Sequence, residues 1–263
     1  MKMKKRIVLI GSGNVATHLA LGLRNKCHIT QVYSRTMAHA ERLSRMIEGS
    51  VAVDDLSHID LNADIYIICV PDDAIDSIVA SVPDNGALWL HTSGTTSLDV
   101  LSKHRENCGV LYPMQSFSRE LAVDWNDVHI FVEGSNESTL EIVKNLAGIL
   151  TSNVTSCDSD KRRVLHVAAV FSCNFTNHMW CQASDLLAEH GLSFDAMLPL
   201  IRNTVEKLNN LTPEQSQTGP ALRGDHEVIA RHLSMLGGRR HEIYKLLSES
   251  IMEMAGINHE QNI

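Results

Sequence analysis

The chain has 263 residues, 44% of them hydrophobic, and a formal net charge of −8 at pH 7. This length suits two modest domains. The negative charge argues against a nucleic-acid partner, and no run approaches the roughly 20 apolar residues of a membrane span. Six cysteines without a C-x-x-C pair indicate reduced thiols, and no signal-peptide hydrophobic region follows the basic start, so we expect a cytoplasmic protein.

The first predicted elements are a strand near 6–10 and a helix near 14–25, joined by a glycine turn. The turn reads Gly11-Ser12-Gly13-Asn14-Val15-Ala16. Gly11 permits the tight turn, Gly13 lets the backbone approach a phosphate, and Ala16 keeps the helix close to the strand. The helix start also offers unpaired N–H groups and a partial positive charge. We therefore expect the residues from Gly11 to Val15 to bind a dinucleotide, with Ser12 and Asn14 among them.

The second strand, near 29–33, is followed by Ser34-Arg35-Thr36, where an NAD site usually carries a ribose-binding acid. A carboxylate would repel a 2′-phosphate, whereas Arg35 can form charge-assisted bonds and both hydroxyls can donate. The segment thus predicts NADP(H) rather than NAD(H). The alternative is that Arg35 is a solvated loop charge beside an unused turn.

Further strands are expected near 65–70, 87–91, 109–111, 128–132 and 153–156, with helices near 37–47, 73–81, 97–104 and 137–150. This alternation predicts an α/β fold, with a doubly wound, mostly parallel Rossmann sheet in a dinucleotide-binding domain over 1–157. Residues 158–263 look all-helical, with helices near 161–190, 194–210, 225–235 and 238–255. The first of these is apolar on several faces, so it is either the centre of a helical substrate domain or half of a dimer interface.

Three loops follow predicted strand ends, where open α/β sheets bind ligands. In the first, Val70, Pro71 and Ala74 would contact the cofactor, or Asp72 or Asp73 would cap the next helix. In the second, His91, Thr92 and Ser93 would lie at the site, or the loop is a turn with a helix cap at Thr96 or Ser97. In the third, which reads Tyr112-Pro113-Met114-Gln115-Ser116-Phe117, Gln115 would line a pocket, or the loop is an ordinary one.

Three residues of the helical half are candidates for the site. His166 and Asn174 are spaced to share one helix face, and His166 is either a general acid or an interior histidine. A buried Asn174 would need a partner, which a substrate or another helix could supply. Arg223 could hold a substrate carboxylate, or it belongs to a turn in which Asp225 caps the next helix. Fourteen histidines show no ligand spacing, so we expect no metal.

Several motifs together resemble a bacterial family of Rossmann-like NADP-binding oxidoreductases with a helical C-terminal domain. They are the glycine turn, Ser34-Arg35, Leu90-His91-Thr92-Ser93-Gly94, the loop at 112–117 and Thr218-Gly219-Pro220-x-x-Arg223-Gly224-Asp225. The family is similar to pyrroline-5-carboxylate reductase and deazaflavin-dependent NADP reductase, and more distantly to β-hydroxyacid dehydrogenases. The resemblance implies an NADP cofactor, an active cleft between the domains and a homodimer formed through the helical domain.

One departure from those relatives bears on the reaction. β-Hydroxyacid dehydrogenases carry a Lys and an Asn spaced by one helical turn on the first interdomain helix, whereas Lys161 is followed here by Leu165 and His166. This difference argues against β-hydroxyacid oxidation and leaves a catalytic role to His166 or His91.

We therefore predict an NADP(H)-dependent oxidoreductase that reduces a small carbonyl or imine substrate. His166 or His91 would be the general acid, because imidazole titrates near working pH. Ser93, Gln115 and Asn174 would orient the substrate, and Arg223 would hold a carboxylate. Two alternatives are an NADP-binding sensor or scaffold without turnover, and a deazaflavin–NADP hydride exchanger.

Overall fold

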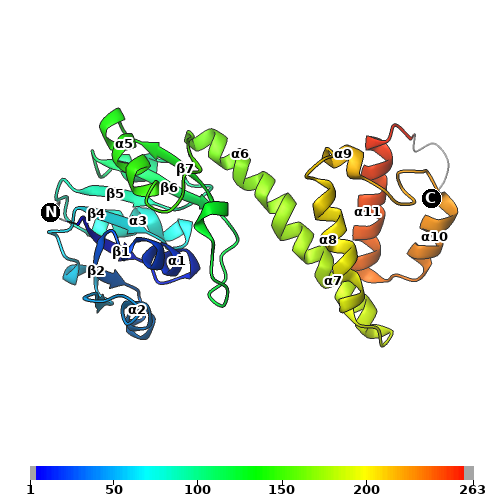
Figure 1. The fold of residues 1–263 in the computed structure, drawn as a ribbon, viewed down its shortest axis with the longest axis horizontal. Coiled ribbons are helices and arrows are strands. Elements are labelled where there is room, and N and C mark those ends of the chain that lie inside the picture. Colours follow the sequence, from blue (N-terminus) through cyan, green and yellow to red (C-terminus); the bar gives the residue numbers. More distant parts are fainter. Residues whose placement is uncertain (1–3, 258–263) are drawn as a thin grey trace. The chain divides into compact units, whose positions relative to one another are not determined.

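A computed structural model describes residues 4–257 of the chain (Figure 1). The chain divides into two compact units, Met1–Asn174 and Phe175–Ile263. The division falls inside the helical segment that follows the sheet, whereas the sequence places the domain boundary at 157/158, where the sheet ends.

The first unit is built on an eight-stranded sheet of order β3-β2-β1-β4-β5-β6-β7-β8. Its strands are β1 (Arg6–Ile10), β2 (His28–Tyr33), β3 (Val51–Val53), β4 (Ile65–Ile68), β5 (Leu88–His91), β6 (Cys108–Met114), β7 (His129–Gly134) and β8 (Val154–Ser156). Neighbouring strands run parallel except β6 and β7, which are antiparallel. The predicted doubly wound, mostly parallel sheet is confirmed.

Helices cover both faces of this sheet (Figure 1), because alternate residues of each strand point to opposite faces. The helices are α1 (Asn14–Leu23), α2 (Met37–Ser44), α3 (Ile75–Ser81), α4 (Asp99–Ser102) and α5 (Glu137–Ala147). Ile7 and Leu9 of β1 belong to a cluster with apolar residues of α1, α2 and α5. Val8 and Ile10 belong to the opposite cluster, with residues of α3 and α4. Two apolar layers therefore hold the strand ends in fixed positions.

One strand of this unit was not predicted, and one expectation is wrong. The strand is β3, whose three residues are too few to show a period. The proposed cap of α3 by Asp72 or Asp73 is absent: a 3₁₀ turn over Asp72–Ala74 precedes the helix, and neither start has a side-chain cap. Asp72 forms other hydrogen bonds, described below.

The segment after β8 is helical but not uniform. α6 (Ser159–Ala169) begins at Asp158, whose carboxylate accepts the N–H of Lys161 at 2.8 Å. A π-helical stretch (Val170–Phe175) follows, and α7 (Thr176–Glu189) continues from it. The single helix expected over 161–190 therefore contains a wider turn, and such turns are frequent at functional sites.

The second unit contains α7, a 3₁₀ turn (Phe194–Met197), α8 (Leu198–Lys207), α9 (Pro213–Ser216), α10 (His226–Ser234) and α11 (Gly238–Met254). Its buried cluster is small, with Ala221, Ile229, Leu233 and Met252. Asp225 caps α10 as expected, since its carboxylate accepts the N–H of Val228 at 3.2 Å. Between residues 4 and 257, no helix is both long and apolar enough to cross a bilayer.

Candidate functional site

The glycine turn between β1 and α1 leaves room for a ligand at one of its two glycines. Gly11 has φ +117°, and a Cβ there would overlap the carbonyl oxygen of Cys69, so this glycine is required by the fold. A Cβ on Gly13 would meet no atom within 4 Å. No side chain caps α1 and its first turn has no acid. Its first N–H groups are therefore available to an anion, and the turn fits a dinucleotide phosphate.

A pocket of about 170 Å³ opens beside this turn. Eight predicted cofactor residues line it, namely Gly11, Ser12, Gly13, Ser34, Arg35, Val70, Pro71 and Ala74, together with Tyr33, Cys69 and Ile78. None of these described lining residues is a carboxylate. The other five predicted cofactor residues, Asn14, Val15, Thr36, His91 and Thr92, are not part of the lining.

The chain after β6 crosses the start of α1. Asn14 donates from Nδ2 to the carbonyl oxygen of Phe117 at 2.8 Å, and Arg119 donates from Nη2 to that of Ser12 at 3.0 Å. His18 Nε2 lies 2.8 Å from the carbonyl oxygen of Ser118. The segment 115–120 is thus fastened to the glycine turn by side chains from both sides.

The loop after β5 connects the edge of the pocket beside the glycine turn to a second group of polar residues. Thr92 donates from its hydroxyl and its N–H to the carbonyl oxygen of Ile68, both at 3.1 Å. Ser93 Oγ donates to Asp72 at 2.7 Å, and Thr95 donates to the same carboxylate oxygen. Burial works to raise the pKa of Asp72, but the hydrogen bonds from Thr95, Ser93 and a further threonine lower it below its usual value. Asp72 is therefore an ionised anchor for this loop.

His91 lies fully inside the protein. Its Nδ1 accepts the N–H of Ser93 at 3.2 Å. Burial lowers the pKa of His91 to about 4, and the nearby Arg162 cation acts in the same direction. The ring is therefore neutral at physiological pH with its proton on Nε2, which has no hydrogen-bond partner among the described residues. This geometry gives His91 a structural role in the turn.

His166, on α6, meets a tyrosine that sequence reasoning did not single out. Its Nδ1 lies 3.2 Å from Tyr112 Oη, and the two rings meet edge to face. A Cβ on Gly94 would lie 2.5 Å from His166 Nδ1, so only glycine leaves room for this pair. Burial raises the pKa of Tyr112, with Arg162 opposing it. The phenol therefore keeps its proton, and the direction of its hydrogen bond with His166 Nδ1 depends on the tautomer of the imidazole.

The His166–Tyr112 pair borders a pocket of about 430 Å³. Its lining consists of Tyr112, Met114, Gln115, Ser116, Leu165, His166, Ala168, Ala169, Ser172, Cys173 and Asn174. Three predicted substrate residues, Gln115, His166 and Asn174, thus line one pocket, whereas Ser93 bonds Asp72 instead. Arg223 belongs to the second unit. A few polar groups among apolar walls are typical of small-molecule sites.

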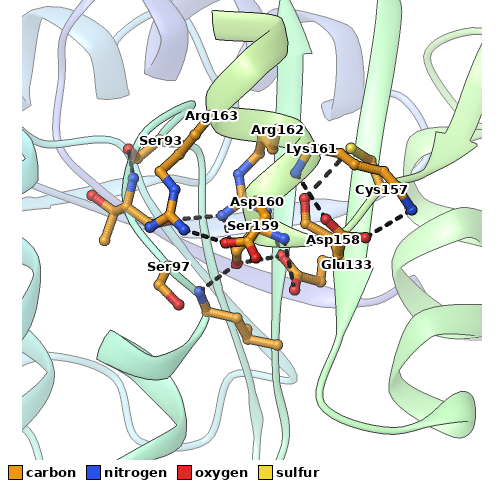
Figure 2. A network of polar contacts seen from close by, with 12 residues as sticks. Ser93, Ser97, Glu133, Cys157, Asp158, Ser159, Asp160, Lys161, Arg162 and Arg163 are labelled. Carbon is orange, nitrogen blue, oxygen red and sulfur yellow. Dashed lines mark hydrogen bonds and ion pairs between the residues drawn. The ribbon is translucent and has the colours of Figure 1, made fainter.

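A buried arginine fixes the start of α6 (Figure 2). The Arg162 side chain is 1% exposed and pairs with Glu133 of β7 through Nη1. Its Nη2 donates to the carbonyl oxygen of Thr96 at 2.5 Å and to Ser159 Oγ at 3.1 Å. These contacts bind α6 to the loop after β5 and to the sheet. They therefore position His166, one turn further along the helix.

No group of three or more potential metal ligands occurs in the part of the chain that the structure describes. The residues of this region form a glycine turn at an uncapped helix start, two pockets and the His166–Tyr112 pair.

Comparison with known proteins places this arrangement in context. Residues 6–88 match the family described as NADP oxidoreductase, coenzyme F420-dependent, and residues 128–251 match the domain of unknown function DUF2520. No curated protein matches the sequence. Among solved structures, a "putative NADP oxidoreductase" from Bacteroides fragilis is 41% identical, with a TM-score of 0.89, and the match covers 95% of this chain and 98% of that chain.

Two further structures are similar in fold. A reductive aminase from Aspergillus terreus in complex with NADPH and ethyl-5-oxohexanoate is 15% identical, with a TM-score of 0.64 and coverage of 98% of this chain and 90% of that one. An imine reductase variant from Myxococcus stipitatus in complex with NAD⁺ is 18% identical, with a TM-score of 0.63 and coverage of 98% and 96%. By its 41% identity to the Bacteroides fragilis protein over nearly the whole of both chains, this chain belongs to the same family of NADP oxidoreductases, which combines a Rossmann-like sheet with a helical C-terminal region.

Proposed function

We propose that this protein uses NADPH to reduce a small carbonyl or imine compound in the pocket beside His166. The observation that carries the proposal is the series of contacts that links the pocket beside the glycine turn, the nucleotide pocket, to the pocket beside His166. Pro71 lines the nucleotide pocket, and the adjacent Asp72 holds Ser93 and Thr95. Gly94, between those two residues, lies against the His166–Tyr112 pair of the second pocket.

The glycine turn and the segment after β2 would hold the cofactor. The N–H groups of the first turn of α1 fit the pyrophosphate, and Arg35 with Ser34 would bind the 2′-phosphate that distinguishes NADP from NAD. NADP is the cofactor of the family, in agreement with the sequence prediction. Bound NADPH supplies the hydride.

His166 and Tyr112 would supply the proton. A carbonyl that gains a hydride needs a proton on its oxygen, and an imine needs one on its nitrogen. The Tyr112 oxygen can accept the Nδ1 proton of a protonated His166, so the imidazolium would give its Nε2 proton to the substrate and become neutral. Gln115 and Asn174, which line the same pocket, offer amide groups that can orient the substrate.

His91 is less suited to the role of acid. It is fully buried, and its low pKa keeps it unprotonated at neutral pH. The proposal therefore assigns proton transfer to His166 alone of the two predicted histidines.

A second candidate, hydride exchange between NADP and a deazaflavin, is favoured by the family that residues 6–88 match. That match covers only the strands and helices around the proposed nucleotide site. It therefore supports the choice of cofactor, but it does not include the residues that line the second pocket. Titration with coenzyme F420, followed by absorbance, distinguishes the two: reduction of F420 by NADPH would favour exchange.

The proposed function is tested by NADPH oxidation with a panel of ketones, ketone–amine mixtures and cyclic imines. Replacing His166 by Gln should lower kcat by about 10²- to 10⁴-fold and leave the NADPH dissociation constant unchanged. Tyr112→Phe should cause a smaller loss. The control is His39→Gln, a change of an exposed side chain of α2 that should alter neither quantity. Full turnover in the His166 variant would remove that residue from the mechanism.

Absence of turnover with every compound of this panel would also be informative. If NADPH binds tightly and no compound oxidises it, the alternative of an NADP-binding sensor or scaffold gains support, since a fold does not fix a reaction.

A further inference from the structure

The segment 115–120 places the guanidinium of Arg119 against the glycine turn. Arg119 donates from Nη2 to the carbonyl oxygen of Ser12 at 3.0 Å, and Ser12 lines the nucleotide pocket. The two residues before Arg119 are held as well, since Asn14 and His18 of α1 form hydrogen bonds with the carbonyl oxygens of Phe117 and Ser118. The ring of Phe117 also stacks on His18, with 5.0 Å between centroids. The backbone that bears Arg119 is therefore fixed over the start of α1.

Arg119 forms no direct ion pair among residues 4–257. The hydrogen bond that the carboxylate of neighbouring Glu120 accepts from Ser118 lowers the pKa of Glu120, and the charge of Arg119 contributes to that lowering. The Ser12 carbonyl occupies one of the five N–H donors of the guanidinium. Donors therefore remain for an anion beside the turn.

We propose that Arg119 binds the pyrophosphate of the dinucleotide. The inference rests on the proposed use of NADP. A pyrophosphate brings two negative charges to a chain that already carries a net charge of −8, and the helix start offsets only about half a charge. Arg35 lies at the end of β2, where the motif places the ribose, so the pyrophosphate lacks a cation of its own without Arg119.

If the two arginines bind different phosphate groups, their variants should differ in which nucleotide they bind more weakly. NADPH and NADH share the pyrophosphate, whereas only NADPH has the 2′-phosphate. Loss of a charge-assisted bond to phosphate weakens binding by roughly tenfold or more. Arg119→Gln should therefore raise the dissociation constants of NADPH and NADH by the same factor. Arg35→Gln should raise that of NADPH alone.

The experiment is a titration of the full-length wild type and variants with NADPH and with NADH, followed by nicotinamide fluorescence. The matched control is Arg24→Gln, because Arg24 also donates to a backbone carbonyl, that of Met46 at 3.2 Å, but caps the opposite end of α1. Arg24→Gln should leave both dissociation constants unchanged. Arg119→Lys, which keeps the charge but loses the forked donors, should fall between Arg119→Gln and the wild type.

Two results would overturn the assignment of Arg119. One is a change below twofold for both nucleotides in Arg119→Gln, and the other is a loss confined to NADPH, which would place this side chain at the 2′-phosphate. Either can occur while the wild type binds NADPH tightly, so the proposed function would survive. A wild type that binds neither nucleotide would instead refute the proposed function.

Discussion

The two glycines of the nucleotide turn meet different physical demands. Gly11 is fixed by the fold, through its positive φ and its approach to Cys69, whereas Gly13 has φ −76° and open space where a Cβ would stand. Ala at position 11 should therefore destabilise the fold by more than about 1 kcal/mol. Ala at position 13 should leave the unfolding temperature unchanged but weaken NADPH binding, because its methyl group occupies the phosphate's space. Thermal unfolding and nucleotide titration of both variants check this pair, and undiminished NADPH affinity in Gly13→Ala would contradict it.

His91 should make the stability of the protein depend on pH. Its pKa is about 4 in the folded state and about 6.5 in an unfolded chain, so between these values only the unfolded chain binds the proton. Stability should thus fall as pH decreases from about 6.5 to 4, by about 3 kcal/mol from this residue. His91→Asn keeps an acceptor for the Ser93 N–H, but the asparagine side chain does not bind a proton in this pH range. Denaturant unfolding should therefore show that the unfolding free energy of this variant depends less on pH than that of the wild type. Parallel curves of unfolding free energy against pH for the two proteins would refute the role given to His91.

Single residues show where sequence reasoning reaches its limit. The predicted cofactor residues at 11–13, 34–35, 70–71 and 74 meet in one pocket because a motif with a fixed backbone geometry specifies them. Arg162 was missed: it stands in the run Lys161-Arg162-Arg163, and only the packing of α6 decides which of the three turns inward. Tyr112 and Asp72 likewise gain their roles from partners distant in sequence, His166 and the hydroxyls of the loop after β5.

At the scale of elements, α6 is held to the sheet by one buried ion pair. Removal of Arg162 leaves Glu133 without its cation, and breaking such a pair costs about 3–5 kcal/mol. Arg162→Ala should therefore lose about 3 kcal/mol of unfolding free energy, and its kcat should fall because His166 loses its anchor. Arg163→Ala is the matched control, since its pair with Asp160 is exposed and contributes about 1 kcal/mol or less. Denaturant unfolding of both variants measures the difference, and equal losses would show that burial of this pair does not matter.

Among the strands that were predicted correctly, Ile65–Ile68 and Leu88–His91 have the clearest signal, a continuous apolar run, since helices cover both of their faces. The misses have a common cause. β3 and α9 are too short for a periodic pattern, and the π-helical stretch over Val170–Phe175 changes the period within one apolar helix. Elements therefore follow from the sequence where a repeating pattern lasts for several residues.

At the scale of the whole molecule, the distribution of apolar side chains differs between the two units. The sheet buries two large clusters, whereas the second unit buries only a small one. Large hydrophobic side chains are exposed on α6, α8 and α11, with exposed fractions of 70% for Val164, 61% for Leu200 and 67% for Leu246. Globular proteins rarely leave so much apolar surface on their helices unless a partner covers it.

A second copy of this chain is the partner that we expect, as the resemblance implies. Homodimer interfaces are more apolar than ordinary surface, which suits these helices. Sedimentation at micromolar concentration should therefore give a dimer, and the double change Val164→Glu and Val167→Glu should give a monomer, because each buried carboxylate would lack a counter-charge. Val51→Glu is the control, since Val51 is also exposed but lies on the short strand β3 and should leave the dimer intact. A monomeric wild type would contradict the dimer. Dissociation by the β3 change as well would mean that added charge, rather than loss of this helix face, separates the copies.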